Sequence, residues 1–164
     1  MHKKYISLGL MSGTSGDGVD ASVIISDGIS SYESIKNKYF EYDEEIYKKI
    51  HFLKEKINNP LDLEKISKDL VELEKKITFF HAKIIKDLNI KYEDFLVGFH
   101  GQTIYHNAKE KVSNQLGNGR LLYQLIKKKI VFNFRKNDIK NGGEGAPLTP
   151  IFHKYLLKSK KIEL

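Results

Sequence analysis

Four polar, glycine-rich segments of this 164-residue chain hold the side chains that could do chemistry. They lie at 9–20, 98–103, 115–120 and 132–150. Each begins in, or directly follows, a short apolar run of the kind that forms a strand. Ligands of an open α/β sheet bind where its strands end. We therefore expect the function of the protein to reside in these four segments.

The first segment is typical of a phosphate-binding hairpin. It reads Gly-Leu-Met-Ser-Gly-Thr-Ser-Gly-Asp-Gly-Val-Asp at 9–20, and its glycines permit positive φ and close approach of the backbone to an anion. It is not a Walker loop, because no Gly-Lys-Ser/Thr follows and the next element is predicted to be a strand. Asp17 and Asp20 would repel a phosphate unless Mg²⁺ intervenes, so we expect a water-mediated magnesium contact. An ordinary polar hairpin is the alternative interpretation.

The second and third segments offer an imidazole and amides for hydrogen bonds to a ligand with several hydroxyls. The second places His100 and Gln102 at the end of a predicted strand, and the third reads Gln-Leu-Gly-Asn-Gly-Arg at 115–120. Both residue types suit a sugar-like ligand. For His100 a satisfied core histidine is the alternative, and His81 and His106 are expected at the surface or in packing. None of these histidines has metal-ligand spacing with another.

The fourth segment is dense in turn-forming residues. It reads Phe-Asn-Phe-Arg at 132–135 and Asn-Gly-Gly-Glu-Gly-Ala-Pro-Leu-Thr-Pro at 141–150. Its glycines suggest a loop that folds closely against a ligand or another strand, followed by a helix whose amino end attracts anions. Arg135 is expected to pair with a phosphate or with Asp138.

The composition argues against several classes of protein. The absence of cysteine excludes a disulfide framework, thiolate metal sites and a cysteine nucleophile. No apolar run approaches the roughly 18 residues of a membrane-spanning helix. The net charge is +7, but the basic residues are dispersed lysines apart from Arg120 and Arg135, which argues against a nucleic-acid binder. No secretory segment precedes the first predicted strand, so a cytoplasmic protein is expected.

The hydrophobic pattern predicts a mixed α/β domain that positions these segments. We expect strands over 5–11, 19–26, 31–42, 95–99, 112–116 and 130–134, with 161–164 beginning another. We expect helices over 43–56, 121–127 and 149–157, and a long helix that begins at Asn59-Pro60 and stops near Asn89. Apolar residues spaced three and four apart give the long helix one buried stripe, which favours packing on its own sheet over a coiled coil.

Four ordered blocks make the chain resemble the amino-terminal part of anhydro-N-acetylmuramic acid kinases. They are Gly-Leu-Met-Ser-Gly-Thr-Ser at 9–15, Asp-Gly-Val-Asp at 17–20, His-Gly-Gln-Thr at 100–103 and Gly-Gly-Glu-Gly-Ala-Pro-Leu at 142–148. The resemblance implies an actin-like, sugar-kinase ATPase fold (ribonuclease H-like), of which residues 1–164 would be the first lobe, a mixed sheet with flanking helices.

The same resemblance implies an activity in cell-wall (peptidoglycan) recycling. The γ-phosphate of ATP would pass to the sugar 6-oxygen while water opens the 1,6-anhydro ring, giving N-acetylmuramic acid 6-phosphate. It implies ATP and Mg²⁺ as cofactors and suggests a homodimer. Because family members are much longer, we expect that this chain lacks the second lobe, which supplies the other wall of the nucleotide cleft.

The residues that match the family motifs take their expected roles by position. The ATP phosphate loop would be formed by Gly13, Thr14, Ser15, Gly16, Asp17, Gly18, Val19 and Asp20, with Asp20 holding Mg²⁺ through water. The sugar would be bound by His100, Gln102, Gln115 and Asn118.

The catalytic positions would be Asn133 and Arg135. Family members usually carry an Asp before Phe-Arg as the base that activates the attacking water, whereas this chain has Asn133. An amide does not accept a proton at neutral pH, and the role is worth roughly 10²- to 10⁴-fold in rate. Asp138 is the candidate substitute within the chain. A non-catalytic sugar- or nucleotide-binding remnant of the family is therefore the alternative function.

Overall fold

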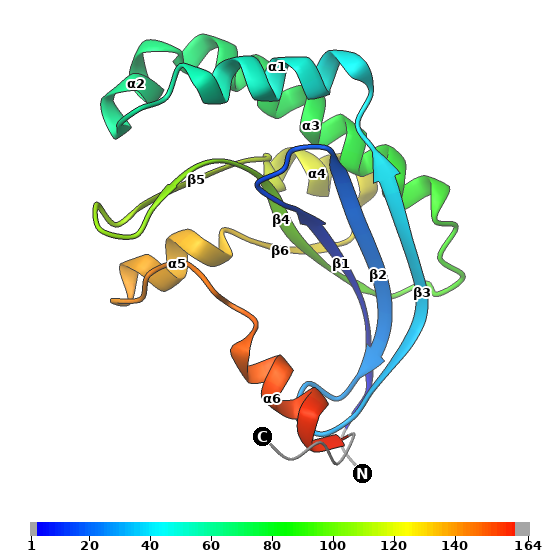
Figure 1. Cartoon of the computed structure of the whole chain (residues 1–164). Helices are drawn as coiled ribbons and strands as arrows, with labels where there is room; N and C mark the ends of the chain where they lie inside the picture. The colour runs from blue at the N-terminus through cyan, green and yellow to red at the C-terminus, as the bar shows by residue number, and fades with distance from the viewer. Residues whose placement is uncertain (1–2, 160–164) are drawn as a thin grey trace.

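The computed structural model describes residues 3–159, with side chains as far as residue 156. This part of the chain has a mixed α/β arrangement, as predicted, in which groups of strands are followed by groups of helices (Figure 1). The strands are β1 (Tyr5–Ser12), β2 (Gly18–Ser26), β3 (Tyr32–Glu41), β4 (Leu96–Asn107), β5 (Val112–Leu116) and β6 (Lys129–Phe132). The helices are α1 (Glu44–Glu55), α2 (Pro60–Lys65), α3 (Ser67–Asp87), α4 (Gly119–Ile126), α5 (Phe134–Lys140) and α6 (Pro150–Ser159).

The six described strands form one mixed sheet in the order β3-β2-β1-β4-β5, with β6 also paired to β4. Strand β2 is antiparallel to both β1 and β3, and β4 runs parallel to β1. The first half of β4 pairs with the parallel strand β6, and its second half forms an antiparallel hairpin with β5. This arrangement brings the end of β1 beside the middle of β4.

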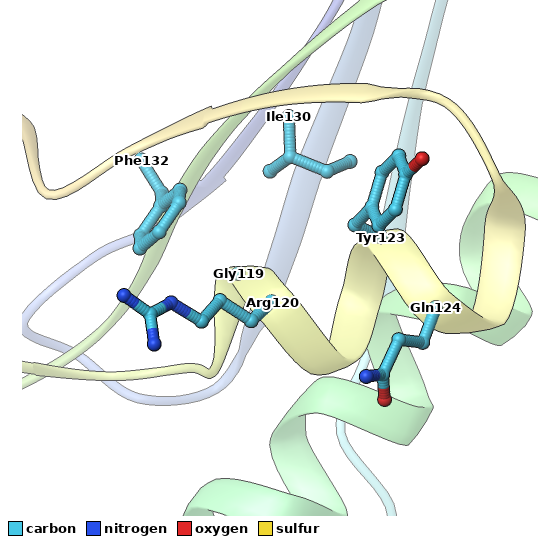
Figure 2. Close-up of a pocket in the computed structure, with 6 residues that line it drawn as sticks. All are labelled: Gly119, Arg120, Tyr123, Gln124, Ile130 and Phe132. Carbon is cyan, nitrogen blue, oxygen red and sulfur yellow. The ribbon is translucent and has the colours of Figure 1, made fainter.

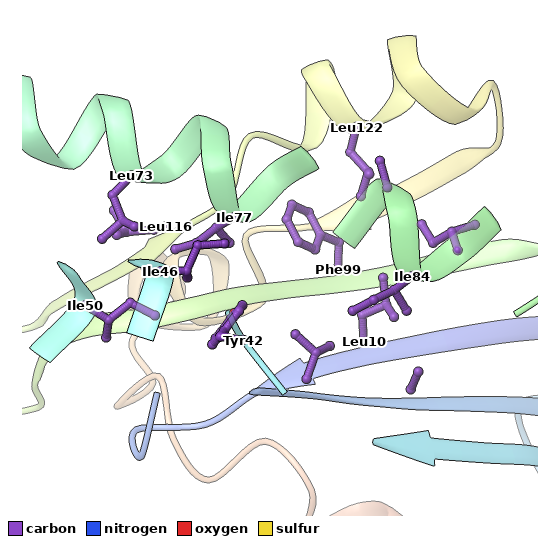
Figure 3. Close-up of a cluster of buried hydrophobic side chains, with 14 of the residues drawn as sticks. Leu10, Tyr42, Ile46, Ile50, Leu73, Ile77, Ile84, Phe99, Leu116 and Leu122 are labelled. Atoms are coloured by element: carbon purple, nitrogen blue, oxygen red, sulfur yellow. The ribbon is translucent and has the colours of Figure 1, made fainter. Parts of the chain in front are cut away.

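Helices α1, α3 and α4 cover one face of the sheet, whereas α5 and α6 lie on the other side (Figure 1). The core lies between the sheet and the first group of helices (Figure 3). Leu8 and Leu10 of β1 and Phe99 of β4 face it, together with the stripe that contains Leu73 and Ile77 of α3. The long helix therefore packs on its own sheet, as its periodicity predicted. None of the described helices is long and apolar enough to cross a membrane.

Local sequence explains where the helices begin. Asp43 caps α1 by accepting a hydrogen bond from the Ile46 amide at 2.8 Å, and Asn59 and Asp62 form a capping box at α2. The single long helix predicted from Asn59 is wrong in one respect. The chain leaves helical geometry at Ile66 (φ −105°, ψ 18°), which separates α2 from α3.

Three other expectations are wrong. The strand predicted to end at Phe99 continues through 100–103 as far as Asn107. The strand predicted as buried over 130–134 is the shorter β6, which alternates between exposed and half-buried residues because it lies at an edge of the sheet. The predicted extent of that strand is also wrong, because Asn133 is left-handed and α5 begins at Phe134. The strand predicted to begin at 161 lies outside the described residues.

A β-bulge interrupts the pairing of β1 with β4. Leu10 is opposite Phe99, but Ser12 is opposite Gln102, so β4 has one residue more than β1 in this stretch. Gly101 supplies the positive φ of +74°, and a Cβ there would lie 2.6 Å from the Leu116 carbonyl oxygen. The bulge changes which face of the sheet the residues after it occupy, because side chains of a regular strand alternate.

Candidate functional site

The loop at 13–17 joins β1 to β2, and its carbonyl groups are tied to the rest of the protein. Gln102 Nε2 donates to the Gly13 oxygen at 2.6 Å, and Lys54 Nζ of α1 donates to the Thr14 oxygen. The Tyr42 amide donates to the Asp17 oxygen at 2.9 Å. In a trans peptide the C=O and N–H point in opposite directions. The Thr14 and Ser15 amides therefore point away from Gln102 and Lys54, as an anion-binding loop requires, whereas the Gly18 amide donates to the Asp17 carboxylate.

Two glycines allow the loop to lie this close to its neighbours. Gly16 has φ +73°, and a Cβ there would lie 2.9 Å from Ile50 Cγ2 of α1. Gly18 has no room for a Cβ, which would lie 2.4 Å from the Phe40 carbonyl oxygen. His51 Nε2 is buried close to Gly16 and has no hydrogen-bond partner among the described residues. Gly16 and Gly18 are thus needed for the shape of the loop.

The two aspartates of the segment differ in their surroundings. Ser15 Oγ donates to Asp17 Oδ1 at 2.6 Å, and this hydrogen bond lowers the pKa of Asp17. Asp20 is exposed on β2, where water reaches its carboxylate. Mg²⁺ in proteins usually keeps several waters and needs one or two carboxylates. The magnesium contact of Asp20 stays a prediction. Among residues 3–156, no cluster of three or more acidic, His or Cys side chains forms a metal cage.

Behind the loop lies a buried polar cluster of Ser12, Tyr42 and Gln102. Ser12 Oγ is 2.6 Å from the Tyr42 hydroxyl and 2.9 Å from both Gln102 Oε1 and the Gly18 oxygen. Ser12 and Gln102 have no exposed surface. Burial raises the pKa of Tyr42, so its hydroxyl stays protonated and donates within the cluster. These hydrogen bonds connect β1, β4 and the start of α1 directly beneath the loop.

His100 lies on the other face of the sheet from Gln102, because the bulge separates them. Its Nδ1 donates to the Gly101 oxygen at 2.7 Å, and its Nε2 accepts from Arg135 Nε at 2.9 Å. These two contacts fix the neutral tautomer. Burial, and then the Arg135 charge, lower the pKa of His100. Arg135 therefore contacts His100, and no ion pair with Asp138 is formed among the described residues. Its predicted contact with a phosphate stays a prediction.

We expect the Arg135→Met variant to raise the pKa of His100. The substitution removes a positive charge and the donor to Nε2, while the burial that also lowers the pKa remains. The pKa should be measured by following the His100 ring signals in an NMR titration. Arg135→Lys, which keeps the charge, is the control. An unchanged pKa in the Met variant would contradict the contact.

Asn133 precedes α5 in left-handed geometry (φ 62°, ψ 32°), and its exposed side chain makes no capping hydrogen bond. Asp138 accepts from the Gly145 amide at 2.8 Å, so its carboxylate holds the glycine-rich loop at 142–148. A Cβ at Gly143 would overlap that carboxylate at 2.1 Å, which explains the glycine there. This use of Asp138 does not favour it as a replacement base.

Gln115 and Asn118 lie near the β4–β5 hairpin. Gln115 is paired with Thr103, and its Nε2 donates to Ser113 Oγ at 2.8 Å. Asn118 caps α4, because its Oδ1 accepts from the Leu121 amide at 2.9 Å. The structure therefore places Gln115 on the hairpin and uses the Asn118 oxygen locally. Their predicted contacts with a sugar stay predictions.

Two cavities lie near these residues. One of about 320 Å³ lies between α3 and β5, and Gln115 and Lys136 line it. The other, of about 310 Å³, lies between α4 and β6, where Arg120, Tyr123 and Phe132 border it (Figure 2). None of the predicted site residues lines the second cavity. The first cavity is lined by one predicted site residue, Gln115.

Sequence reasoning missed two residues that shape the loop. Tyr42 lies in the short connection before α1, and Lys54 lies in the last turn of that helix. Both contact the loop through its carbonyl oxygens, at sequence distances that no local pattern reveals. The only signal in the sequence was the polar Tyr-Asp pair that precedes the predicted helix.

Comparison with known proteins identifies relatives across almost the whole chain. A sequence model of the family described as anhydro-N-acetylmuramic acid kinase matches residues 4–163. Proteins of that name from Pelagibacter ubique (strain HTCC1062) and Gluconobacter oxydans (strain 621H) are 59% and 37% identical to the chain, over 99% and 92% of its length. The one from Agrobacterium fabrum is 35% identical over 90% of the chain. The matches cover 44%, 42% and 41% of these relatives, so the chain spans less than half their length.

Proposed function

The chain belongs to the anhydro-N-acetylmuramic acid kinase family, and we propose that it carries the ATP-phosphate loop and part of the sugar site of such an enzyme. The relatives are named as kinases, which are phosphotransferases that use ATP. We also propose that the mixed sheet and its flanking helices form the first lobe of an actin-like fold, whose second lobe completes the nucleotide cleft. The cytoplasmic location and the homodimer implied by the family stay predictions.

The orientation of the 13–17 loop is the observation that carries the proposal. Its Gly13 and Thr14 carbonyl oxygens are held by Gln102 and Lys54, so the Thr14 and Ser15 amides point away from these partners. A phosphate chain placed there would accept hydrogen bonds from those amides and from the hydroxyl of Thr14, whereas the Ser15 hydroxyl donates to Asp17. Mg²⁺, held through water by Asp20, would neutralise the charge of the phosphates.

The reaction proposed for the family needs two coupled displacements. Water attacks the anomeric carbon, the bond between that carbon and the 6-oxygen breaks, and the 6-oxygen attacks the γ-phosphorus of ATP. ADP leaves, and the proton of the water passes to a base. In this chain the loop amides would orient the phosphates, and Arg135 keeps His100 neutral and holds its ring in place. The position of the base is occupied by Asn133, which offers no basic group.

Asn133 favours a second candidate function. A chain that binds the nucleotide or the sugar without releasing ADP would be a non-catalytic remnant of the family. The exposed amide of Asn133 and the use of Asp138 within the 142–148 loop both support this alternative. Incubation of the purified chain with Mg·ATP and the anhydro-sugar separates the two functions, because only an enzyme produces ADP and the sugar 6-phosphate.

The phosphate site itself is tested by comparing two glycine variants. We expect Mg·ATP to shift the backbone amide signals of residues 13–18 in NMR spectra of the chain, and Gly16→Ala to abolish these shifts. Gly16 has φ +73° and meets Ile50, so a methyl group forces the loop out of place.

Gly28→Ala is the matched control. Gly28 also has a positive φ, of +74°, but a Cβ there would meet nothing within 4 Å. It lies beyond the end of β2 that is farther from the loop. Both substitutions carry a similar backbone strain of about 1–2 kcal/mol. Only the Gly16 variant should lose the response to Mg·ATP. Equal responses in the two variants, or none in the unmodified chain, would contradict the proposed phosphate site.

A further inference from the structure

We propose that Gln102 is a positioning residue of the phosphate loop and not a ligand of the sugar. The inference rests on the proposed function, because it concerns how the same loop is held ready for phosphate. Gln102 acts through the Gly13 carbonyl, and Ser12 holds it in place. The His-Gly-Gln-Thr segment is thereby divided between two tasks, with His100 facing α5 and Gln102 facing the loop.

The hydrogen-bonding capacity of Gln102 is used inside the protein. Its Nε2 carries two N–H donors, and these reach the Gly13 oxygen at 2.6 Å and the Thr103 oxygen at 3.1 Å. Its Oε1 accepts from Ser12 Oγ at 2.9 Å. The side chain has no exposed surface. No donor remains for a sugar hydroxyl, and a sugar would have to displace a buried hydrogen bond to reach the amide.

The bulge in β4 explains why Gln102 faces the loop. In a regular strand His100 and Gln102 would lie on the same face, because side chains two residues apart point the same way. Between Phe99 and Gln102, β4 has one residue more than β1 has between Leu10 and Ser12. This extra residue moves the Gln102 side chain to the face of Leu10 and Ser12. There it reaches the first peptide of the loop. Bulges commonly redirect side chains next to functional sites.

Holding the Gly13 oxygen inward fixes the direction of the Thr14 amide. The two groups belong to one trans peptide, so they point in opposite directions. Loss of the Gln102 donor leaves the Gly13 oxygen without this partner and allows the peptide to rotate. Rotation would turn the Thr14 amide away from the phosphate and present a carbonyl oxygen to it. Gln102 thus affects phosphate binding without touching the phosphate.

Two substitutions separate the donor from the shape of the side chain. Gln102→Met keeps the length but provides no donor. Gln102→Glu keeps the shape, but the ionised carboxylate faces the Gly13 and Thr103 oxygens and repels them. Burial and these two oxygens should raise the pKa of the introduced carboxyl above its ordinary value of about 4.3. When protonated, it donates to the Gly13 oxygen again.

The affinity for Mg·ATP should be measured from the NMR shifts of the 13–18 amides at about pH 8 and about pH 5, each variant being compared with the unmodified chain at the same pH. We expect both variants to bind about tenfold more weakly at the higher pH, the cost of one lost buried hydrogen bond. At the lower pH Gln102→Glu should recover to near the unmodified chain, whereas Gln102→Met should not.

The unmodified chain controls for other groups that titrate nearby. On the α1 side these groups are Tyr42, His51 and Lys54. On the sheet and in the loop they are His100 and Asp17. Gln124→Glu, on the exposed side of α4, controls for the added charge and should bind like the unmodified chain at both pH values.

The outcomes distinguish failure of the proposed phosphate site from failure of the proposed role of Gln102. If the unmodified chain shows no response to Mg·ATP, the proposed phosphate site is wrong and the role of Gln102 falls with it. If the unmodified chain responds and both Gln102 variants bind equally well, only the positioning role is wrong. Weaker binding by both variants without recovery of Gln102→Glu at low pH would also overturn it, because the donor would then not be the decisive group.

Discussion

Asn133→Asp is expected to raise the rate of anhydro-ring opening by about 10²- to 10⁴-fold, the contribution of a correctly placed general base. The backbone at this position is left-handed (φ 62°, ψ 32°), a geometry that both Asn and Asp tolerate. The new carboxylate would also lie at the amino end of α5, where the helix favours negative charge. The rate is measured as coupled formation of ADP and the sugar 6-phosphate.

The matched control for this variant is Asn137→Asp. Asn137 is also exposed and lies one helical turn after Asn133 in α5. The two substitutions therefore add the same charge, but the carboxylate at 137 lies farther along the chain from the end of β6. We expect no gain in rate from it. If Asn133→Asp binds Mg·ATP and the sugar but releases no ADP, the water-activating role does not belong to this position, and the non-catalytic function is favoured.

Acidification from about pH 7 to about pH 4 is expected to destabilise the fold by about 3 kcal/mol through His81 alone. The ring is fully buried in α3, where Nδ1 donates to the Ile77 oxygen at 2.8 Å and the ring packs 4.9 Å from Phe99. Burial is the main cause that lowers the pKa of His81 from 6.5 to about 4. Each factor of ten in proton affinity corresponds to about 1.4 kcal/mol.

The direction of this pH dependence follows from the pKa of His81 in the folded and the unfolded chain. The unfolded chain binds a proton at His81 near pH 6.5, whereas the folded chain binds it only near pH 4. The stability is therefore complete above pH 6.5 and decreases as the pH falls toward 4. The free energy of unfolding should be measured by urea denaturation across this range.

His81→Phe should flatten that dependence, because the ring remains apolar and does not titrate. His153→Gln is the control for removing a histidine, since His153 is exposed on α6. It should leave the pH dependence unchanged. If the unmodified chain and His81→Phe lose stability in parallel, another group is responsible for the acid sensitivity.

Much of the fold could be predicted from local patterns. The hairpin of β1 and β2, the helix capped by Asp43 and the helix that begins at Pro150 lie close to their expected bounds, because each depends on an apolar run and a nearby turn or cap. The break at Ile66 was not predictable in the same way. The apolar spacing continues across it, so the pattern describes two helices as one.

The candidate site was predictable as a set of segments but not as a set of contacts. The position of the phosphate loop followed from its glycines and hydroxyls, whereas the partners of its carbonyls come from α1 and β4. His100 and Gln102 were grouped because they are two residues apart. The bulge at Gly101 separates them, and a single glycine in a polar stretch does not reveal it.

The bulge also limits how the length of this segment can vary among functional descendants of the chain. An insertion or deletion between Phe99 and Gln102 would shift the alternation by one residue and exchange the faces of the following side chains. Gln102 would then turn toward α5, and the loop beyond Ser12 would lose its support. Point substitutions at exposed positions nearby leave this parity intact. We therefore expect evolutionary change here to occur by replacement of residues and not by a change in their number.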